Sequence, residues 1–317
     1  MSKISIDTPV VLILYKRPEL TRLVFNRISQ VKPRELFIIA DGPKRENEEE
    51  NCLRAREVVD SINWECEIKR NYSDINLGCR ERVSSGLDWV FSQVEEAIIL
   101  EDDCLPSVSF FYFCQELLRY YRDDKRVWVI SGNNFQDGIE RSDFSYFFSK
   151  YPLIWGWATW KRAWDEFDAD LETWTDEFAM QIIRTVCEDS HEQEYRFQRF
   201  KDITQGRLDA WAPRWLFTCW ANSGLSVIPK VNLVSNIGFG IQGTHTLDAK
   251  NKYANLKSHE LNLINHPINH ASMIYRDINA DQYTYNHFFG GIKNKESRKL
   301  KNRIKRKVRR IVKLDEQ

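Results

Sequence analysis

Three consecutive acidic residues follow one of the most apolar runs in the sequence. Residues 97–100 read AIIL, as expected of a buried strand, and they lead directly into Glu101, Asp102 and Asp103. Adjacent carboxylates at the open end of a strand supply the oxygen ligands that Mg²⁺ and Mn²⁺ prefer, and such a cation can also bind a diphosphate. A solvated acidic turn is the alternative, because acidic doublets are common. The motif by itself leaves both interpretations open.

Two polar residues in the second half of the chain are further candidates. His245 lies in a segment that reads GIQGTHT. Histidine is a frequent metal ligand, but a lone histidine in a loop is more often a surface or hydrogen-bonding residue. Asp209 is close in sequence to Trp211 and Trp215, and a carboxylate beside apolar rings can act as a general base. The competing interpretation of Asp209 is a helix N-cap, a position that favours Asp.

An aromatic segment is the last candidate. The sequence LIWGWATW contains Trp155, Gly156 and Trp157. Indole rings can pack against the apolar faces of sugar rings, and a glycine between them allows the backbone to approach closely. Ordinary packing in a hydrophobic core explains the same residues at least as well. The segment therefore predicts either a sugar-binding wall or part of the core.

Strands and helices that could position these residues alternate over residues 8–131. Short apolar runs predict strands, and apolar residues at helical spacing, such as Leu20, Val24 and Ile28, predict the helices between them. The predicted strands cover residues 9–15, 36–40, 64–68, 97–100 and 127–130. This alternation predicts an α/β fold with a doubly wound, mostly parallel sheet.

In such sheets, ligands bind outside the carboxyl ends of the strands. Asp41, Asp102, Asp103 and Ser131 each lie at a predicted strand end. We therefore expect residues 1–132 to form the ligand-binding α/β half. The pattern is looser over residues 133–292, which we interpret as the other half of the same domain.

Residues 293–317 form a basic tail. This tail has 12 Lys and Arg against 3 Asp and Glu, whereas the whole chain has 46 of each, so the remainder carries a net charge of 34 − 43 = −9. Leu300, Ile304, Val308 and Ile311 share one helical face. A basic amphipathic helix of this kind suits an anionic membrane surface. Binding to the acidic body of the protein, or a disordered arm of the nucleic-acid-binding type, would explain the charge as well.

Composition and missing motifs exclude several classes of protein. Apolar residues make up 42% and charged residues 29%, as in globular proteins. No apolar run approaches the roughly 20 residues of a membrane span, and the polar N-terminus lacks a signal-peptide pattern. The seven cysteines have no C-x-x-C spacing, which favours reduced thiols and a cytoplasmic location. The sequence lacks the G-x-G-x-x-G motif of dinucleotide dehydrogenases, the P-loop of NTPases, the G-x-S-x-G motif of hydrolases and a Cys/His cluster typical of zinc sites.

Taken in order, the motifs resemble those of the GT-A superfamily of glycosyltransferases. The resemblance is greatest to the N-acetylglucosaminyltransferase I-like group and its bacterial nucleotide-diphospho-sugar transferase relatives. It spans about residues 8–246. The matching pieces are PVVLILYKRPE, LFIIADGPK, the Asn76-Leu77-Gly78 turn before Arg80, IILEDDC, LIWGWATW, and GLSVIPKVNLVSNIGFG followed by THT.

The resemblance implies a role for each residue of the acidic turn. Asp103 matches the residue that binds a divalent cation, Mn²⁺ or Mg²⁺, at the donor diphosphate. Glu101 and Asp102 match its neighbours near the ribose and the donor sugar. His245 matches a late histidine close to the metal. Because the sequence has Glu-Asp-Asp where many relatives have Asp-x-Asp, either aspartate can be the main metal ligand.

The resemblance also implies the rest of the site. Five more residues are expected to bind the donor. Tyr15, Lys16 and Arg17 follow the first strand, Asp41 ends the second strand, and Arg80 lies at the start of a later helix. Asp41 matches a residue that reads the nucleotide base. The acceptor is expected in residues 133–292, with Trp155, Gly156 and Trp157 among its contacts. Asp209 matches the general base of inverting enzymes.

The expected activity is therefore metal-dependent, inverting transfer of a sugar from a nucleotide diphosphate to a glycan or glycolipid. Assembly of a bacterial surface polysaccharide, on the inner face of the cell membrane, is the expected setting, and no nucleic-acid partner is expected. Two other functions compete. One is an inactive scaffold that binds glycans or proteins. The other is a sugar-phosphate nucleotidyltransferase, which would need a glycine-rich loop after the first strand, where this chain has KRPEL.

Overall fold

The computed structural model describes residues 6–171, 174–239, 252–262 and 267–292. Among these residues, eight strands form one sheet in the order β3-β2-β1-β4-β8-β6-β9-β7, and two short strands form a separate pair. The strands of the sheet are β1 (Val10–Leu14), β2 (Glu35–Ala40), β3 (Glu67–Tyr72), β4 (Glu96–Glu101), β6 (Val127–Ser131), β7 (Tyr146–Ser149), β8 (Trp157–Trp160) and β9 (Leu225–Pro229). The separate pair is β5 (Cys104–Pro106) with β10 (Val234–Asn236).

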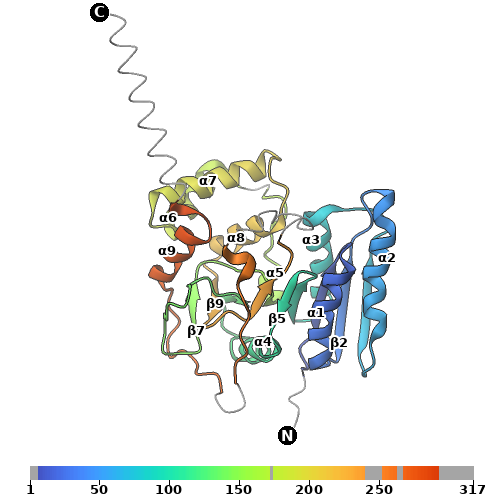
Figure 1. Cartoon of the computed structure of the whole chain (residues 1–317). Coiled ribbons are helices and arrows are strands. Elements are labelled where there is room, and N and C mark those ends of the chain that lie inside the picture. The colour runs from blue at the N-terminus through green and yellow to red at the C-terminus, as the bar shows by residue number, and fades with distance from the viewer. Residues whose placement is uncertain (1–5, 172–173, 240–251, 263–266, 293–317) are drawn as a thin grey trace, which may run out of the picture.

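Helices cover both faces of the sheet (Figure 1). They are α1 (Pro18–Val31), α2 (Glu49–Glu57), α3 (Gly78–Phe91), α4 (Val108–Tyr120), α5 (Lys161–Trp164), α6 (Asp176–Val186), α7 (Ser190–Thr204), α8 (Trp211–Ala221) and α9 (Ile278–His287). Three short 3₁₀ helices are η1 (Glu46–Glu48), η2 (Val58–Ser61) and η3 (Lys252–Asn255). Several α-helices begin with residues that favour a helix N-terminus. Helix α1 begins at a proline, and the side chains of Thr175, Asp189 and Asp277 cap α6, α7 and α9.

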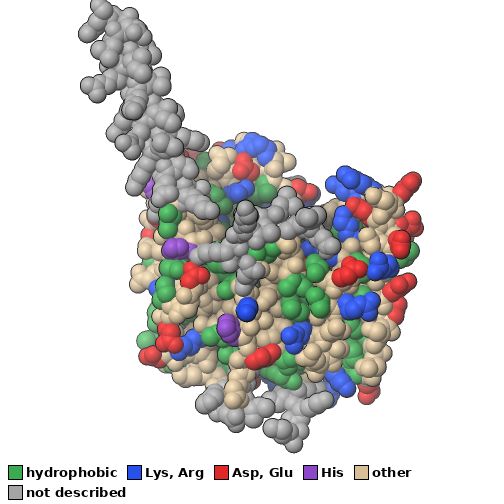
Figure 2. Space-filling model, in the orientation of Figure 1, with side chains coloured by type: hydrophobic (Ala, Val, Ile, Leu, Met, Phe, Trp, Pro, Cys, Tyr) green, Lys and Arg blue, Asp and Glu red, His purple; other side chains and the backbone are tan. Residues whose placement is uncertain are grey.

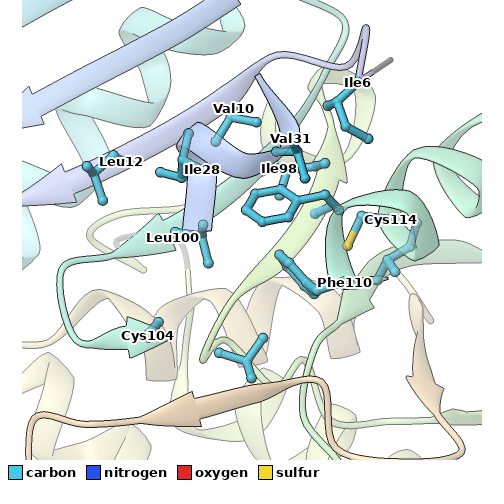
Figure 3. Packing of buried hydrophobic residues seen from close by; sticks show 14 of the residues in the cluster. Ile6, Val10, Leu12, Ile28, Val31, Ile98, Leu100, Cys104, Phe110 and Cys114 are labelled. Carbon is cyan, nitrogen blue, oxygen red and sulfur yellow. The ribbon is translucent and has the colours of Figure 1, made fainter. Parts of the chain in front are cut away.

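Successive residues of β1 face opposite sides of the sheet. Val10, Leu12 and Leu14 pack with α1, α2 and α4, whereas Val11 and Ile13 pack with α3, α5 and α8. Figure 3 shows the first of these clusters, in which side chains of β1 and β4 face those of α1 and α4. A strand buried on both faces needs apolar residues throughout, which explains the continuous run that the sequence shows here. The predicted α/β architecture is thus confirmed.

The sheet is mostly parallel, as predicted, but it contains two antiparallel strands that the sequence pattern did not predict. Strand β8 lies between β4 and β6 and runs antiparallel to both, and β7 is antiparallel to β9. The sheet is therefore mixed, although β1, β2, β3 and β4 are parallel. Trp157 of β8 packs on one face of the sheet and Trp160 on the other. The sequence of β8, Trp-Ala-Thr-Trp, is neither a continuous apolar run nor a strict alternation, so the pattern does not predict this strand.

The edge strand β3 also begins later than predicted. It covers residues 67–72 instead of 64–68. Trp64 packs against Phe25 of α1 with ring centroids 6.0 Å apart, and its indole N–H donates to the carbonyl of Pro33 at 2.9 Å. Trp64 and Cys66 therefore lie in a loop before the strand, and of the three alternating residues only Ile68 lies within it.

The described part of residues 133–292 builds a third apolar cluster at the side of the molecule opposite α1 and α2 (Figure 1). Helices α6, α7, α8 and α9 contribute to it. Acidic and basic side chains are interspersed on the opposite side, along α2 (Figure 2). None of the helices in the described ranges is both long and apolar enough to cross a membrane. His245 and the tail of residues 293–317 lie outside the described residues.

Candidate functional site

The carboxyl ends of β1, β2 and β4 meet at one edge of the sheet. Ile13 of β1 is in register with both Ile39 of β2 and Glu101 of β4, and all three strands run parallel. The segments that follow these strands therefore lie next to one another, as the alternating pattern predicts. Ser131 ends β6, but it is fully buried and its hydroxyl accepts a hydrogen bond from the backbone of Leu153 at 3.2 Å, so it belongs to the core.

The guanidinium of Arg17 binds both aspartates of the acidic turn. Its Nε and Nη2 donate to the two carboxylate oxygens of Asp102, and its Nη1 donates to Oδ2 of Asp103 at 2.9 Å. The backbone N–H of Tyr15 also donates to Asp102, at 3.4 Å. The side chains of Arg17 and Asp102 are 13% and 3% exposed. The structure thus places Arg17 against the predicted metal ligands in a largely buried, charge-assisted cluster.

Burial and mutual repulsion change the protonation of this cluster. Burial, followed by the charges of Asp103 and Asp102, raises the pKa of Glu101 to about 8. Burial also raises the pKa of Asp102, and the charge of Arg17 is the main opposing effect. Burial disfavours the charged form of Arg17, but the two aspartates outweigh it and raise the pKa of the guanidinium. Arg17 is therefore the main group that opposes the effect of burial on Asp102.

The chain near Gly238 closes over Asp103. The backbone N–H of Ile237 donates to the carbonyl of Asp103 at 2.8 Å, next to the β5–β10 pair. A Cβ atom at Gly238 would lie 2.2 Å from Oδ2 of Asp103, so only glycine can occupy this position without displacing the carboxylate. His245 lies outside the described residues, and its predicted role therefore stays a prediction.

Asp41 closes the start of α3. Its Oδ1 accepts from the backbone N–H groups of Gly42 and Leu77, each at 2.9 Å. Its Oδ2 accepts from the Asn76 amide at 3.0 Å and from the backbone of Gly78 at 3.1 Å. These four bonds satisfy both oxygens, so a nucleobase would have to replace one of them to be read by this carboxylate. The base-reading role implied by the resemblance stays a prediction.

Glu48 is a residue at this edge that the sequence does not single out. It accepts hydrogen bonds from the Tyr15 hydroxyl at 2.7 Å, from Nζ of Lys16 at 2.5 Å and from the backbone of Lys44 at 3.0 Å. The bonds from Lys16 and Tyr15 lower the pKa of Glu48 to about 2. No local pattern distinguishes Glu48 from the other glutamates of the stretch ENEEEN. Two of its three hydrogen-bond donors, Tyr15 and Lys16, are more than thirty residues away in the sequence.

Arg80 and Asp209, both predicted site residues, form an ion pair. Nε of Arg80 lies 2.6 Å from Oδ1 of Asp209, and Nη1 of Arg80 lies 3.0 Å from Oδ1 of Asp170. The Asp209 side chain is 69% exposed. The N-cap of α8 is Ala210, and no side chain caps that helix. The helix-cap interpretation of Asp209 is therefore wrong.

The thiol of Cys79 is influenced by several of these carboxylates. Burial raises the pKa of Cys79 to about 12, and the charges of Glu101, Asp209, Asp103 and Asp41 contribute in that order. Carboxylates from three separate parts of the chain, namely Asp41, the acidic turn and Asp209, therefore act on one position at the start of α3. The structure brings the predicted donor-binding residues and the predicted base to one region.

The two tryptophans of the aromatic segment differ. Trp157 is 1% exposed and stacks on Trp211 with ring centroids 5.7 Å apart, so the core interpretation describes it. Trp155 is half-buried and meets Phe239 edge-on at 5.6 Å. Gly156 between them has a φ of +72°, and its carbonyl accepts from the backbone of Gly132 at 2.8 Å. Of the two rings, that of Trp155 is the one a ligand could contact.

The residue types of the acidic turn fit a divalent cation, because Asp102 and Asp103 already converge on one positive group, Arg17. Each of their four carboxylate oxygens has a partner, however, since Oδ1 of Asp103 lies 3.5 Å from Sγ of Cys104. Across the residues that the structure describes, no group of three or more His, Cys, Asp and Glu side chains is arranged to hold a metal. A cation at these carboxylates would have to displace Arg17.

An open groove lies elsewhere, near the start of β6. Its volume is about 600 Å³, and its lining residues are Tyr120, Tyr121, Asp124, Arg126, Ala271, Ser272, Met273 and Ile274. None of the candidate site residues lines this groove. Because β6 runs parallel to β4, the groove lies near the amino ends of the strands, away from the edge that carries the carboxylates.

By sequence, the chain matches no protein-family profile and no curated protein. By structure, it is similar to 4-diphosphocytidyl-2C-methyl-D-erythritol synthase from Anaerococcus prevotii DSM 20548, with 11% identity and a TM-score of 0.32 over 62% of this chain and 84% of that one. It is also similar to a UDP-glucose pyrophosphorylase complexed with UDP-glucose, with 8% identity and a TM-score of 0.39 over 73% and 94%. These similarities are too low to carry an activity over to this chain.

Proposed function

We propose that the chain is a glycosyltransferase that moves a sugar from a nucleoside diphosphate to a hydroxyl of a glycan or lipid-linked glycan. The observation that carries the proposal is that two charged clusters lie at one edge of the sheet. The acidic turn with Arg17 and the Arg80–Asp209 pair both lie at the edge where α/β sheets bind ligands. The ordered sequence motifs supply the reaction class.

The turn after β1 would bind the donor. Lys16 and Arg17 bring positive charge to this turn, and Glu48 fixes Tyr15 and Lys16 in place. Guanidinium groups match the geometry of phosphate oxygens, which supports contact between Arg17 and the diphosphate. Arg80, at the start of α3, and Glu101, at the end of β4, would complete the donor site.

Asp103, with Asp102, would hold a divalent cation, and His245 joins them through the sequence resemblance alone. When bound, the cation would neutralise negative charge on the diphosphate. Because Arg17 contacts both aspartates in this structure, the cation site becomes accessible only when the guanidinium moves.

Asp209 would be the general base. Its carboxylate takes the proton from the acceptor hydroxyl while that oxygen bonds to the anomeric carbon. The bond between the anomeric carbon and the phosphate oxygen breaks, and the nucleoside diphosphate leaves with its electron pair. Attack from the face opposite the leaving group inverts the configuration. The exposure of Asp209 supports access for an acceptor, and Trp155 is a candidate to line the acceptor site.

A substrate panel tests the proposal. The purified chain is incubated with UDP-, GDP-, CMP- and dTDP-sugars, with and without Mn²⁺, and hydrolysis and thermal stabilisation are recorded. We expect one nucleotide-sugar class to stabilise the protein and to be hydrolysed slowly. A second arm supplies nucleoside triphosphates with sugar phosphates, and release of pyrophosphate there would identify a nucleotidyltransferase instead. Absence of binding in both arms would support the inactive scaffold.

The basic tail suggests where the acceptor is found. We propose that residues 293–317 bind an anionic membrane and bring the active site close to a lipid-linked acceptor. Co-sedimentation with anionic and neutral vesicles, for the full chain and a chain ending at Gly291, tests this. Equal binding of both chains to anionic vesicles, or no binding of either, would exclude a membrane role for the tail.

A further inference from the structure

We infer that Arg17 is an internal competitor of the divalent cation, so that cation and diphosphate bind together and neither binds well alone. The inference rests on the proposed function, since it concerns the same site. Without nucleotide, the guanidinium occupies the acidic turn. With nucleotide, the diphosphate offers Arg17 a second set of oxygens and leaves the carboxylates to the cation.

The first argument is the number of oxygens that Arg17 and its neighbours use. Both oxygens of Asp102 accept from Arg17, and one of them also accepts from the backbone of Tyr15. Oδ2 of Asp103 accepts from Arg17, and Oδ1 is in contact with Cys104. A cation that arrives alone must therefore break three charge-assisted hydrogen bonds at once.

The second argument concerns what can move. The carbonyl of Arg17 accepts from the backbone of Thr21 at 2.9 Å and from its hydroxyl at 2.8 Å, so the first turn of α1 fixes the backbone. The side chain beyond it is a flexible stem with a planar, five-donor head. Lys16, the other cation of this turn, is held by Glu48 at 2.5 Å. Arg17 is therefore the group that can move between carboxylate and phosphate with little change elsewhere.

The third argument is charge. Asp102 and Asp103 carry two negative charges against the single positive charge of Arg17, whose side chain is only 13% exposed. A cation bound alone would leave the guanidinium without acceptors in a partly dry site, which is unfavourable. A diphosphate bound alone would take Arg17 from the aspartates and leave them repelling each other. Each ligand thus removes the cost of binding the other, and this coupling is reciprocal.

Mn²⁺ binding without nucleotide tests the inference most directly. The full chain, Arg17→Met and Arg17→Lys are titrated with Mn²⁺ alone, and free Mn²⁺ is followed by electron paramagnetic resonance. We expect Arg17→Met to bind at least about tenfold more tightly than the wild type, in the range of typical coupling between sites. Arg17→Lys keeps the charge but cannot span two carboxylates, so we expect a smaller gain. Arg22→Met, an exposed arginine of α1, is the matched control and should leave the affinity unchanged.

A second titration adds UDP or GDP, whichever the substrate panel selects. The wild type should gain Mn²⁺ affinity at least about tenfold with the nucleotide, and Arg17→Met should lose most of that gain. If Arg17→Met fails to fold, as judged by its thermal transition, Arg17→Lys decides the question. Equal Mn²⁺ affinity of the wild type and both variants without nucleotide would overturn the inference. Because that measurement contains no nucleotide, it is independent of whether the panel identifies a donor.

Discussion

Nε of Arg80 lies 2.6 Å from Oδ1 of Asp209, and this contact joins two parts of the chain that are 129 residues apart. Arg80 lies in the first turn of α3, beside the turn held by Asp41, whereas Asp209 lies directly before Ala210, the N-cap of α8. One ion pair therefore connects the donor-binding edge to the proposed base. Movement of either half would change the position of the carboxylate relative to the donor.

Replacement of Asp209 by Asn should reduce turnover and leave donor binding intact. We expect a fall of about 10²–10⁴-fold in kcat, the usual contribution of a positioned general base. Calorimetry with the donor nucleotide should give the wild-type affinity. Asp170→Asn is the matched control, because Asp170 pairs with the same arginine. A similar loss of turnover in both variants would mean that the contact with Arg80, rather than proton transfer, is what matters.

The two aspartates that bind Arg17 should differ in their effect on stability. Asp102 accepts two hydrogen bonds from Arg17 and is 3% exposed on its side chain, whereas Asp103 accepts one and is 13% exposed. Asp102→Ala should lower the free energy of unfolding by about 3 kcal/mol, because it leaves a buried charge poorly paired. Asp103→Ala should cost less and abolish Mn²⁺-dependent nucleotide binding. Urea unfolding and nucleotide titrations measure the two effects, and equal losses of stability would contradict the assignment.

Glu48 should make stability depend on pH in the acid range. Its pKa lies near 2 in the folded protein, below its usual 4.5, because Lys16 and Tyr15 bind the ionised form. A carboxylate whose pKa is lower in the folded than in the unfolded protein stabilises the fold at any pH above its unfolded pKa. That stabilisation is lost as the pH falls towards the folded pKa. Glu48→Gln should therefore be less stable than the wild type at about pH 6, and the difference should shrink by about pH 3. Glu50→Gln, an exposed neighbour, serves as the control for unfolding curves at each pH. A difference that stays constant over this range would contradict the assignment.

The tryptophans on either side of Gly156 should separate stability from binding. Trp157→Ala removes a fully buried side chain and should cost about 3–5 kcal/mol. Trp155→Ala should cost less and raise the KM for the acceptor. Trp174→Ala, another half-buried tryptophan that packs on Phe200 and Phe217, is the control. Equal KM values for the wild type and Trp155→Ala would remove Trp155 from the acceptor site.

The sequence predicted the parallel strands and their polar ends because both depend on local patterns. The run before Tyr15 and the AIIL run before Glu101 are apolar on both faces, and a polar residue marks where each strand leaves the core. Strand β8 escaped prediction for the opposite reason. Its four residues are held by pairing with β4 and β6, which are distant in sequence, so no local period announces it.

The sequence predicts which edge of the sheet carries the site, but not which side chains pair there. The strand order brings Arg17, Asp102 and Asp209 to one edge, but no spacing rule indicates that arginines neutralise the carboxylates there. Glu48 is the clearest case, since it is one of several glutamates in a charged stretch and is selected by Tyr15 and Lys16 from another segment. Side-chain pairing between distant segments is decided by three-dimensional distance, which composition and periodicity do not contain.

The position of β8 limits how this protein can be recombined with others. A strand from the second half of the chain lies between β4 and β6 of the first half, with hydrogen bonds to both. A chimera joined at residue 132 would bring in a foreign central strand and would have to match the pairing register of two native neighbours. Exchange of acceptor specificity would therefore be more practicable in helices α6 and α7, which precede α8 and add no strand to the sheet, than at residue 132. The most conspicuous change of pattern in the sequence is thus a poor place to cut the protein.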